Sequence, residues 1–333
     1  MGTDEEPVGS VARPGWIGRR HRSGGVGRPR ALGLGFGHGW LHQAAVRTLR
    51  ERGPAADVRD GLAVRSRRVR IEPRPDRAGR DPLDSTTAEL SEPVQLPEGD
   101  SLAGIRLAVP KQVGALDAIS PGVRRAFEQS LEHARELGAE IRECDLPLSY
   151  RYGMPCYYLV APAEASSNLA RYDGVRYGPR VDGTTYDEMV DRTRDEGFGP
   201  EPKRRIMLGT YALAAGYYDA FYGQAQKVRT LLIREHREAL DGVDAIVTPT
   251  SPTVAFPIGD KAADPLAMYA CDLLTIPSCL AGLPGLSIPC GLSDGLPVGL
   301  QLIGRQFGEN GLFRVGHALE QAIGFDGVPE RLR

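Results

Sequence analysis

The chain has 333 residues, of which 41 are lysine or arginine and 43 are aspartate or glutamate, so its formal net charge is −2. It contains no apolar run of about 18 residues, which argues against a membrane-spanning helix. Its five cysteines form no C-x-x-C pair and its six histidines are scattered, which argues against a metal centre and favours a reducing, cytoplasmic setting.

The first 80 residues differ in composition from the rest. They hold 17 arginines against 8 acidic residues and no lysine, tyrosine or cysteine, which leaves 24 basic and 35 acidic residues for positions 81–333. Residues 1–80 also lack regular periodicity, so we expect this Arg/Gly-rich segment to be disordered and not natively folded. Residues 81–333 are expected to form the folded domain. A basic arm of this kind can also bind RNA phosphates.

The domain begins with a strand, a helix and a second strand. Residues 104–110 alternate as a short strand, and residues 120–138 form an amphipathic pattern with Ser120 as cap and Pro121 in the first turn. Residues 139–146 return as a strand. This order predicts an α/β unit with a right-handed crossover.

Two longer helical patterns follow. Residues 155–170 predict one helix and residues 203–240 a second, in which Gly209 and Gly216 indicate close packing or a bend. Residues 243–252 predict a buried strand that ends in a proline-broken loop.

The C-terminal part predicts the last elements. Residues 264–291 read as an apolar helix, a glycine–proline turn and a strand, and residues 297–305 pair with that strand as a hairpin around "SDG". Residues 310–324 form a last amphipathic helix. The sum is a mixed α/β layer protein without internal repeats.

Charged residues in two of these elements are candidates for function. Asp272 lies inside an apolar helix, where a buried carboxylate must have a cation, a hydrogen-bond donor or water beside it. Lys203, Arg204 and Arg205 begin the second long helix, and such a charge run is usually a solvated face. The chain has no G-x-S-x-G elbow for a hydrolase nucleophile.

Three long strings resemble a known family. They are "APAEASSNLARYDGVRYG" (161–178), "EGFGPEPKRRIMLGTYALAAGYYDAFYGQAQKVRTL" (196–231) and "DPLAMYACDLLTIPSCLAGLPGLSIPCGLSDGLPVGLQLIG" (264–304). All three closely resemble the amidase signature family, and within it the A subunits of tRNA-dependent amidotransferases. The resemblance extends over residues 81–333 and implies the C-terminal part of an α/β/α amidase fold around a mixed central sheet.

The resemblance implies a function and partners. An A subunit of this kind releases ammonia from glutamine. The B subunit, with ATP and magnesium, uses the ammonia to convert Glu-tRNA(Gln) or Asp-tRNA(Asn) into the amide form, and the C subunit clamps the assembly. The chain itself is then expected to carry no cofactor.

The family binds glutamine with a tyrosine, an arginine and an aspartate. Tyr157 matches the first tyrosine of the "YY" that precedes "AEASSN". Arg205 matches the second arginine of "KRR", and Asp272 matches the aspartate of "MYACD". A guanidinium group suits the α-carboxylate of glutamine, and a carboxylate suits its α-ammonium group.

The family's catalytic groups have no match here. The family cleaves its amide with a lysine, a bridging serine and a nucleophilic serine, beside a glycine–serine-rich loop that holds the oxyanion. The first lysine of this chain is Lys111, and neither "GGSSGGS" nor "GSDTGGSIR" occurs in it. No residue inherits a catalytic role, so the resemblance predicts a catalytically defective chain.

Codon degeneracy suggests the reason. Residues 36–43, "FGHGWLHQ", have codons that allow "SDTGGSIR" when they are read one nucleotide later. Residues 69–79, "VRIEPRPDRAG", allow "FASSLDQIGP", another string of the family, in the same shifted frame. The hypothesis is that residues 1–79 are the family's catalytic region translated out of frame. Two alternatives remain open, a stand-alone amidase of the same family and a non-catalytic binding remnant.

Overall fold

The computed structural model describes residues 44–45, 95, 97, 99–257, 259–261 and 264–325. Of residues 1–80, the structure describes Ala44–Ala45. The expectations that this segment is disordered and that residues 1–79 are read in a shifted frame therefore concern residues outside the described ranges. None of the helices in these ranges has the length and apolar character of a membrane span.

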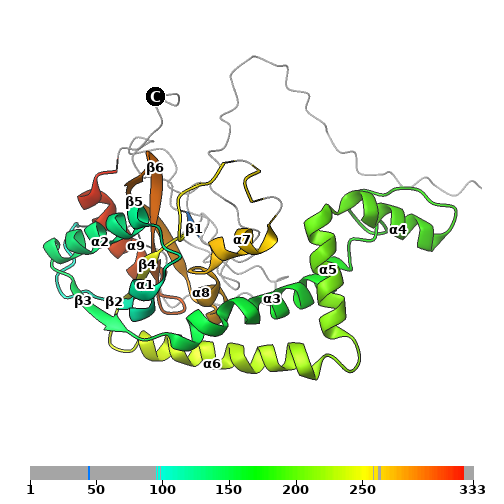
Figure 1. The fold of residues 1–333 in the computed structure, drawn as a ribbon, viewed down its shortest axis with the longest axis horizontal. Coiled ribbons are helices and arrows are strands. Elements are labelled where there is room, and N and C mark those ends of the chain that lie inside the picture. The colour runs from blue at the N-terminus through cyan, green and yellow to red at the C-terminus, as the bar shows by residue number, and fades with distance from the viewer. Residues whose placement is uncertain are drawn as a thin grey trace, which may run out of the picture.

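A mixed sheet forms the centre of the described structure (Figure 1). Strand β2 runs parallel to β3 and β4, while β6 runs antiparallel to β4 and β5, and β1 lies parallel to β5. The six strands, in their order across the sheet, are β1 (Ala44–Ala45), β5 (Gly285–Ser293), β6 (Leu296–Ile303), β4 (Ala245–Pro249), β2 (Arg106–Pro110) and β3 (Glu140–Cys144). The predicted α/β class with a mixed central sheet is confirmed.

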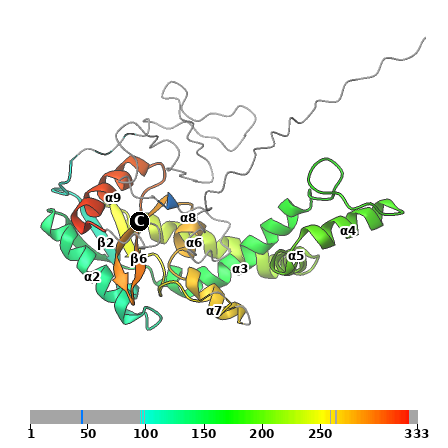
Figure 2. The same cartoon turned by 90° about the horizontal axis from the view of Figure 1, so that it is seen from above.

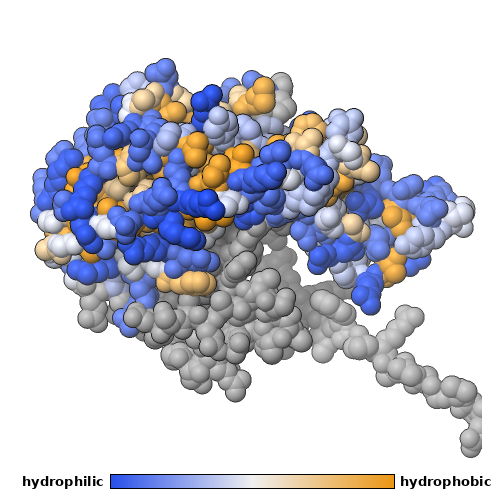
Figure 3. Space-filling model, turned by 90° about the horizontal axis from the view of Figure 1, so that it is seen from below, coloured by the Kyte–Doolittle hydropathy of each residue, from blue (hydrophilic) through white to orange (hydrophobic). Residues whose placement is uncertain are grey.

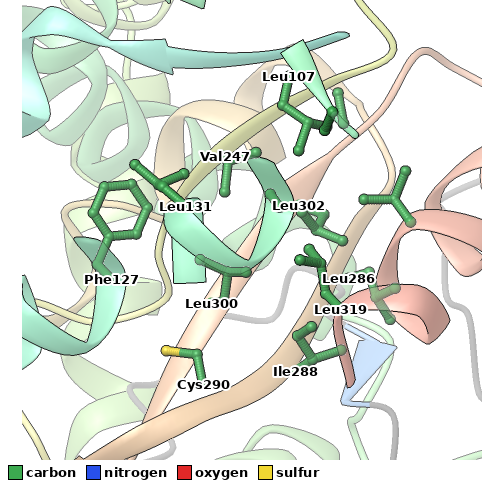
Figure 4. Close-up of a cluster of buried hydrophobic side chains, with 14 of the residues drawn as sticks. Leu107, Phe127, Leu131, Val247, Leu286, Ile288, Cys290, Leu300, Leu302 and Leu319 are labelled. Atoms are coloured by element: carbon green, nitrogen blue, oxygen red, sulfur yellow. The ribbon is translucent and has the colours of Figure 1, made fainter. Parts of the chain in front are cut away.

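Helices cover both faces of this sheet (Figures 1 and 2). Helices α2 (Pro121–Glu136) and α9 (Glu309–Ile323) pack on one face. Figure 4 shows the core that they bury, which includes Leu107, Phe127, Leu131, Val247, Leu286, Ile288, Cys290, Leu300, Leu302 and Leu319. Because side chains alternate along a strand, Ala108, Ile246 and Ile303 point to the opposite face, where they meet the end of helix α6 (Gln224–Ala239).

The predicted strand–helix–strand unit is present. Strands β2 and β3 pair in register from Arg106 opposite Glu140 onward, with α2 as the connection. Pro121 lies in the first turn of α2, where its missing N–H costs nothing. Ser120 occupies the cap position, but its side chain makes no capping hydrogen bond, so that detail of the prediction was wrong. Gly138 ends the helix region with a φ of 94°.

Helix α3 (Pro147–Leu169) begins before the predicted residues 155–170. Its first amides have no partner inside the helix. The Glu235 carboxylate accepts hydrogen bonds from the N–H groups of Leu148 and Ser149, at 2.7 and 2.8 Å. The helix start therefore combines a local signal, Pro147 in the first turn, with a cap from a side chain that is 86 positions further along the chain.

The single helix predicted over residues 203–240 is wrong. The structure has α5 (Pro200–Leu213), a π-helical turn η2 (Asp219–Gly223) and α6 (Gln224–Ala239). The break contains Gly216, whose φ of 88° lies in the left-handed region and cannot continue a right-handed helix.

Gly209 of α5 supports the expectation of close packing. A Cβ atom placed on it would lie 1.9 Å from the carbonyl oxygen of Pro162 in α3. Only a glycine therefore lets α5 lie this close to α3. Helices α3 and α5 extend with α4 (Tyr186–Gly197) to one side of the sheet (Figures 1 and 2).

The apolar helix predicted at the start of residues 264–291 is divided into three short elements. They are α7 (Pro265–Tyr269), the 3₁₀ turn η3 (Ala270–Asp272) and α8 (Ile276–Ala281). A proline in the first turn of α8 cannot supply the N–H that a continuous helix needs there. The division places η3 beside α3 and α5. Tyr269, the residue next to Ala270 of η3, contacts the ring of Tyr158 on α3 and hydrogen-bonds to Glu201 on α5.

The predicted C-terminal hairpin is present. Strands β5 and β6 pair around a two-residue turn, in which Asp294 and Gly295 have φ values of 53° and 75°. Two positive φ values match the twist of the paired strands, which is why "DG" is a strong hairpin signal. The remaining short helix is α1 (Lys111–Ala115). Figure 3 shows mostly hydrophilic residues on the described surface in that view, with apolar residues in small groups.

Candidate functional site

The three predicted site residues come from three different elements. Tyr157 lies on α3, Arg205 on α5 and Asp272 at the end of η3. The structure brings them together, because the Arg205 guanidinium hydrogen-bonds to the Tyr157 hydroxyl. Asp272 lies close enough to Tyr157 for its charge to raise the pKa of that phenol. Their role in binding a ligand stays a prediction.

The charge run at the start of α5 divides between the inside and the outside. The side chains of Lys203 and Arg204 are 38% and 50% exposed, whereas Arg205 as a residue is only 8% exposed. A solvated face is therefore correct for the first two and wrong for Arg205. Burying one guanidinium in a helix whose neighbouring cations remain in water is costly unless acceptors compensate it.

Arg205 has such acceptors and aromatic neighbours. Its Nε donates a hydrogen bond to Oε1 of Glu201, one helical turn earlier, at 2.9 Å. The same Glu201 oxygen accepts from the hydroxyl of Tyr269 at 2.8 Å. The guanidinium carbon lies 6.0 Å from the ring centre of Tyr158 and 5.7 Å from that of Tyr269. Arg205 is thus held in one orientation on several sides.

These contacts keep both Glu201 and Arg205 in their charged forms. Burial would raise the pKa of Glu201, but the hydrogen bonds from Arg205 and Tyr269 outweigh burial and hold it below its ordinary value. Burial would also lower the pKa of Arg205, and there the hydrogen bond to Glu201, with the interaction with Tyr157, outweighs it. Both groups are therefore charged at neutral pH.

Tyr157 and Tyr158 of α3 remain protonated phenols at neutral pH. Burial raises the pKa of Tyr157, Arg205 opposes that effect, and the carboxylate of Asp272 adds to it. Burial followed by the charge of Asp272 also raises the pKa of Tyr158. The Tyr158 hydroxyl is buried and has no hydrogen-bond partner. It is the polar atom of this cluster whose bonding is incomplete.

Sequence reasoning missed two members of the cluster. Glu201 stands four residues before Arg205, a spacing that allows an ion pair on one helix face and could have suggested it. Tyr269 stands three residues before Asp272, but no local signal indicates that its hydroxyl reaches α5. Within the described ranges, no group of three or more histidines, cysteines, aspartates and glutamates is placed to hold a metal ion.

The arrangement combines the buried guanidinium group of Arg205 with the carboxylate of Asp272 in the same cluster. Glu201 is already committed to Arg205 on the Nε side, which directs the other guanidinium nitrogens towards Tyr157. A ligand with one negative and one positive group matches such a pair better than a ligand of one charge.

The amidase family profile matches residues 76–313 of the chain. The chain belongs to the amidase family. The resemblance predicted for residues 81–333 is thereby confirmed as far as residue 313.

Two curated relatives of the chain have the same description, the A subunit of glutamyl-tRNA(Gln) amidotransferase. The chain is 54% identical over 246 residues to this protein from Chloroflexus aggregans, covering 73% of this chain and 50% of the relative. It is 55% identical over 250 residues to the protein of the same description from Moorella thermoacetica, covering 74% and 50%. The chain thus spans about half the length of the curated relatives that it matches.

A solved amidase-family structure agrees with the fold. The crystal structure of the glutamyl-tRNA(Gln) amidotransferase A subunit from Thermotoga maritima superimposes with a TM-score of 0.56 at 40% identity. The match covers 73% of this chain and 48% of that chain. The α/β fold predicted from the resemblance is therefore the fold of this part of the amidase family.

Proposed function

We propose that this chain retains the glutamine-binding site of an amidotransferase A subunit and lacks the centre that hydrolyses glutamine. The observation that supports the retained glutamine-binding site is the buried Arg205, which Glu201 and Tyr157 orient. Asp272 belongs to the same cluster. The shared description of the relatives, which names glutamyl-tRNA(Gln) amidotransferase, supports glutamine as the ligand.

In this proposal the two charged ends of glutamine have separate partners. The guanidinium group of Arg205 hydrogen-bonds to the α-carboxylate, and the carboxylate of Asp272 pairs with the α-ammonium group. The Tyr157 hydroxyl stands beside Arg205 and completes the contact with the carboxylate. A plain amide has neither charged end and leaves the buried Arg205 without a new acceptor.

The second half of the proposal follows from the chemistry of the cluster. Cleavage of an amide needs a nucleophile and a base that takes its proton. Tyr157 has a raised pKa and Arg205 stays charged, so neither accepts a proton at neutral pH. Glu201 has a lowered pKa and is engaged by Arg205 and Tyr269, which makes it a weak base. The lysine and the two serines of the family have no match in the sequence.

We extend the proposal to the partners. The chain is assigned to a cytoplasmic assembly with the B and C subunits of the amidotransferase, in which the B subunit uses ATP and magnesium and the tRNA is Glu-tRNA(Gln) or Asp-tRNA(Asn). The chain itself needs no cofactor. The hypothesis that residues 1–79 are read out of frame accounts for the missing catalytic groups. Stop codons in the shifted frame between codons 36 and 79 would overturn it.

Calorimetric titration of the full chain with L-glutamine and with butyramide tests the binding site. We expect L-glutamine to bind and butyramide, a plain amide, not to bind. Equal binding of the two would favour the stand-alone amidase. Ammonia release is then measured with the B and C subunits, ATP, magnesium and misacylated tRNA. We expect none above background, and turnover would overturn the proposed catalytic defect.

A further inference from the structure

Tyr158 has a hydroxyl group that the fold itself does not use. The hydroxyl oxygen is buried and has no hydrogen-bond partner. Buried polar groups are almost always hydrogen-bonded, because an unsatisfied one forfeits its bonds to water and gains nothing in exchange. A phenylalanine would fill the same space without this cost, so the oxygen needs a reason to be there.

The ring of Tyr158 is held on two sides. It lies on the Tyr269 ring with centres 4.3 Å apart and planes inclined by 32°, and it meets the Tyr157 ring edge-on at 5.0 Å. The Arg205 guanidinium lies over it at 6.0 Å. These contacts restrict the ring, so the direction of its hydroxyl is set before any ligand arrives.

The hydroxyl is close to both charges of the candidate site. Asp272 and Arg205 are the two charged groups with the strongest effects on it, and they act in opposite directions. A phenol can donate one hydrogen bond and accept others, so it can serve either end of a zwitterion. The unsatisfied hydroxyl of the cluster thus lies near the two groups that would bind the charged ends of the proposed ligand.

We propose that the Tyr158 hydroxyl is a further ligand-binding group. It hydrogen-bonds to the zwitterionic head group of the amino acid that lies between Arg205 and Asp272. This inference rests on the proposed glutamine site and adds a fourth contact to Tyr157, Arg205 and Asp272. The fold leaves the hydroxyl unsatisfied, and the ligand satisfies it. The head group of the ligand then enters a polar setting that is prepared in advance.

Tyr158→Phe is the decisive substitution, because it removes only the oxygen and keeps both ring contacts. Without ligand, we expect the melting temperature to stay the same or to rise, because an unsatisfied buried oxygen is lost. With ligand, we expect the Kd for L-glutamine to rise at least about tenfold, which corresponds to about 1.4 kcal/mol. Tyr186→Phe is the matched control, since Tyr186 is 64% exposed on α4, and it should change neither quantity.

Each outcome decides the inference. A parent chain that binds no L-glutamine overturns both the proposed function and this inference. A parent chain that binds, together with a Tyr158→Phe variant that binds equally well, overturns this inference alone. A clear fall in the melting temperature of ligand-free Tyr158→Phe shows that the hydroxyl serves the fold, and it too overturns the inference. Weaker binding with unchanged melting supports it.

Discussion

Glu201→Gln tests whether a carboxylate, and not merely an acceptor of the right shape, holds Arg205. Glutamine keeps the size of the side chain and one oxygen acceptor, but it removes the charge. Arg205 is 8% exposed and the Glu201 side chain 20% exposed, so water replaces little of what is lost. Hydrogen bonds to charged groups contribute about 1.5–3 kcal/mol, and a neutral bond about half as much. We expect a loss of about 1–2 kcal/mol in the free energy of unfolding near neutral pH.

The same substitution has a predicted pH dependence. Because the folded-state pKa of Glu201 lies below its ordinary value, its ionised form is bound more tightly in the folded protein. The stability that it contributes is present above the unfolded-state pKa and is lost as the pH falls through the lower folded-state pKa. The difference in stability between the parent chain and Glu201→Gln should therefore shrink in acid.

Urea unfolding at a series of pH values measures both effects. Glu132→Gln is the control, because Glu132 pairs with Arg135 three residues along a helix but its side chain is 67% exposed. An exposed pair contributes at most about 1 kcal/mol, so this variant should change little. A Glu201→Gln variant as stable as the parent at neutral pH, or a difference that persists unchanged in acid, would refute the reasoning.

Two further substitutions, each with a control substitution, address packing and binding. Gly209→Ala should lower the free energy of unfolding by about 2–3 kcal/mol, because the new methyl group meets the Pro162 carbonyl, and urea midpoints would record this loss. Gly311→Ala on α9 has open space around it and should instead stabilise the protein by up to about 1 kcal/mol; equal effects at both sites would contradict the packing argument. Arg205→Lys should weaken L-glutamine binding at least about tenfold in calorimetry, because a lysine cannot form the planar fork. Lys203→Ala, a change in the exposed part of the same run, should leave binding unchanged, and a similar loss in both variants would count against a specific role for Arg205.

Local sequence determined the elements whose boundaries are set by backbone conformation. The unit from β2 through α2 to β3 follows from Pro121 at a helix start and Gly138 at a helix end. The proline ring fixes φ near its helical value, and glycine permits the positive φ that ends the helix, both without help from the rest of the fold. The hairpin follows from Asp294 and Gly295 for the same reason.

Local sequence was insufficient where a contact between distant segments decides. Residues 203–240 carry a helical pattern in which Gly216 marks a bend, but only the structure shows that the bend divides the pattern into two separate helices, α5 and α6. The start of α3 has a local signal in Pro147, but only the tertiary structure shows that Glu235 caps its first amides.

The same distinction between local sequence and tertiary contacts holds for the candidate site. The sequence, through its resemblance to the family and the cost of burying Asp272, named Tyr157, Arg205 and Asp272 as candidates. Only the tertiary structure decided that Arg205 is buried while its neighbours in the run are not, and that Glu201 and Tyr269 orient it. Residue type and spacing determine which groups can ionise and form hydrogen bonds. Helix packing determines which of these groups meet, because the distance between them depends on elements that are far apart in the chain.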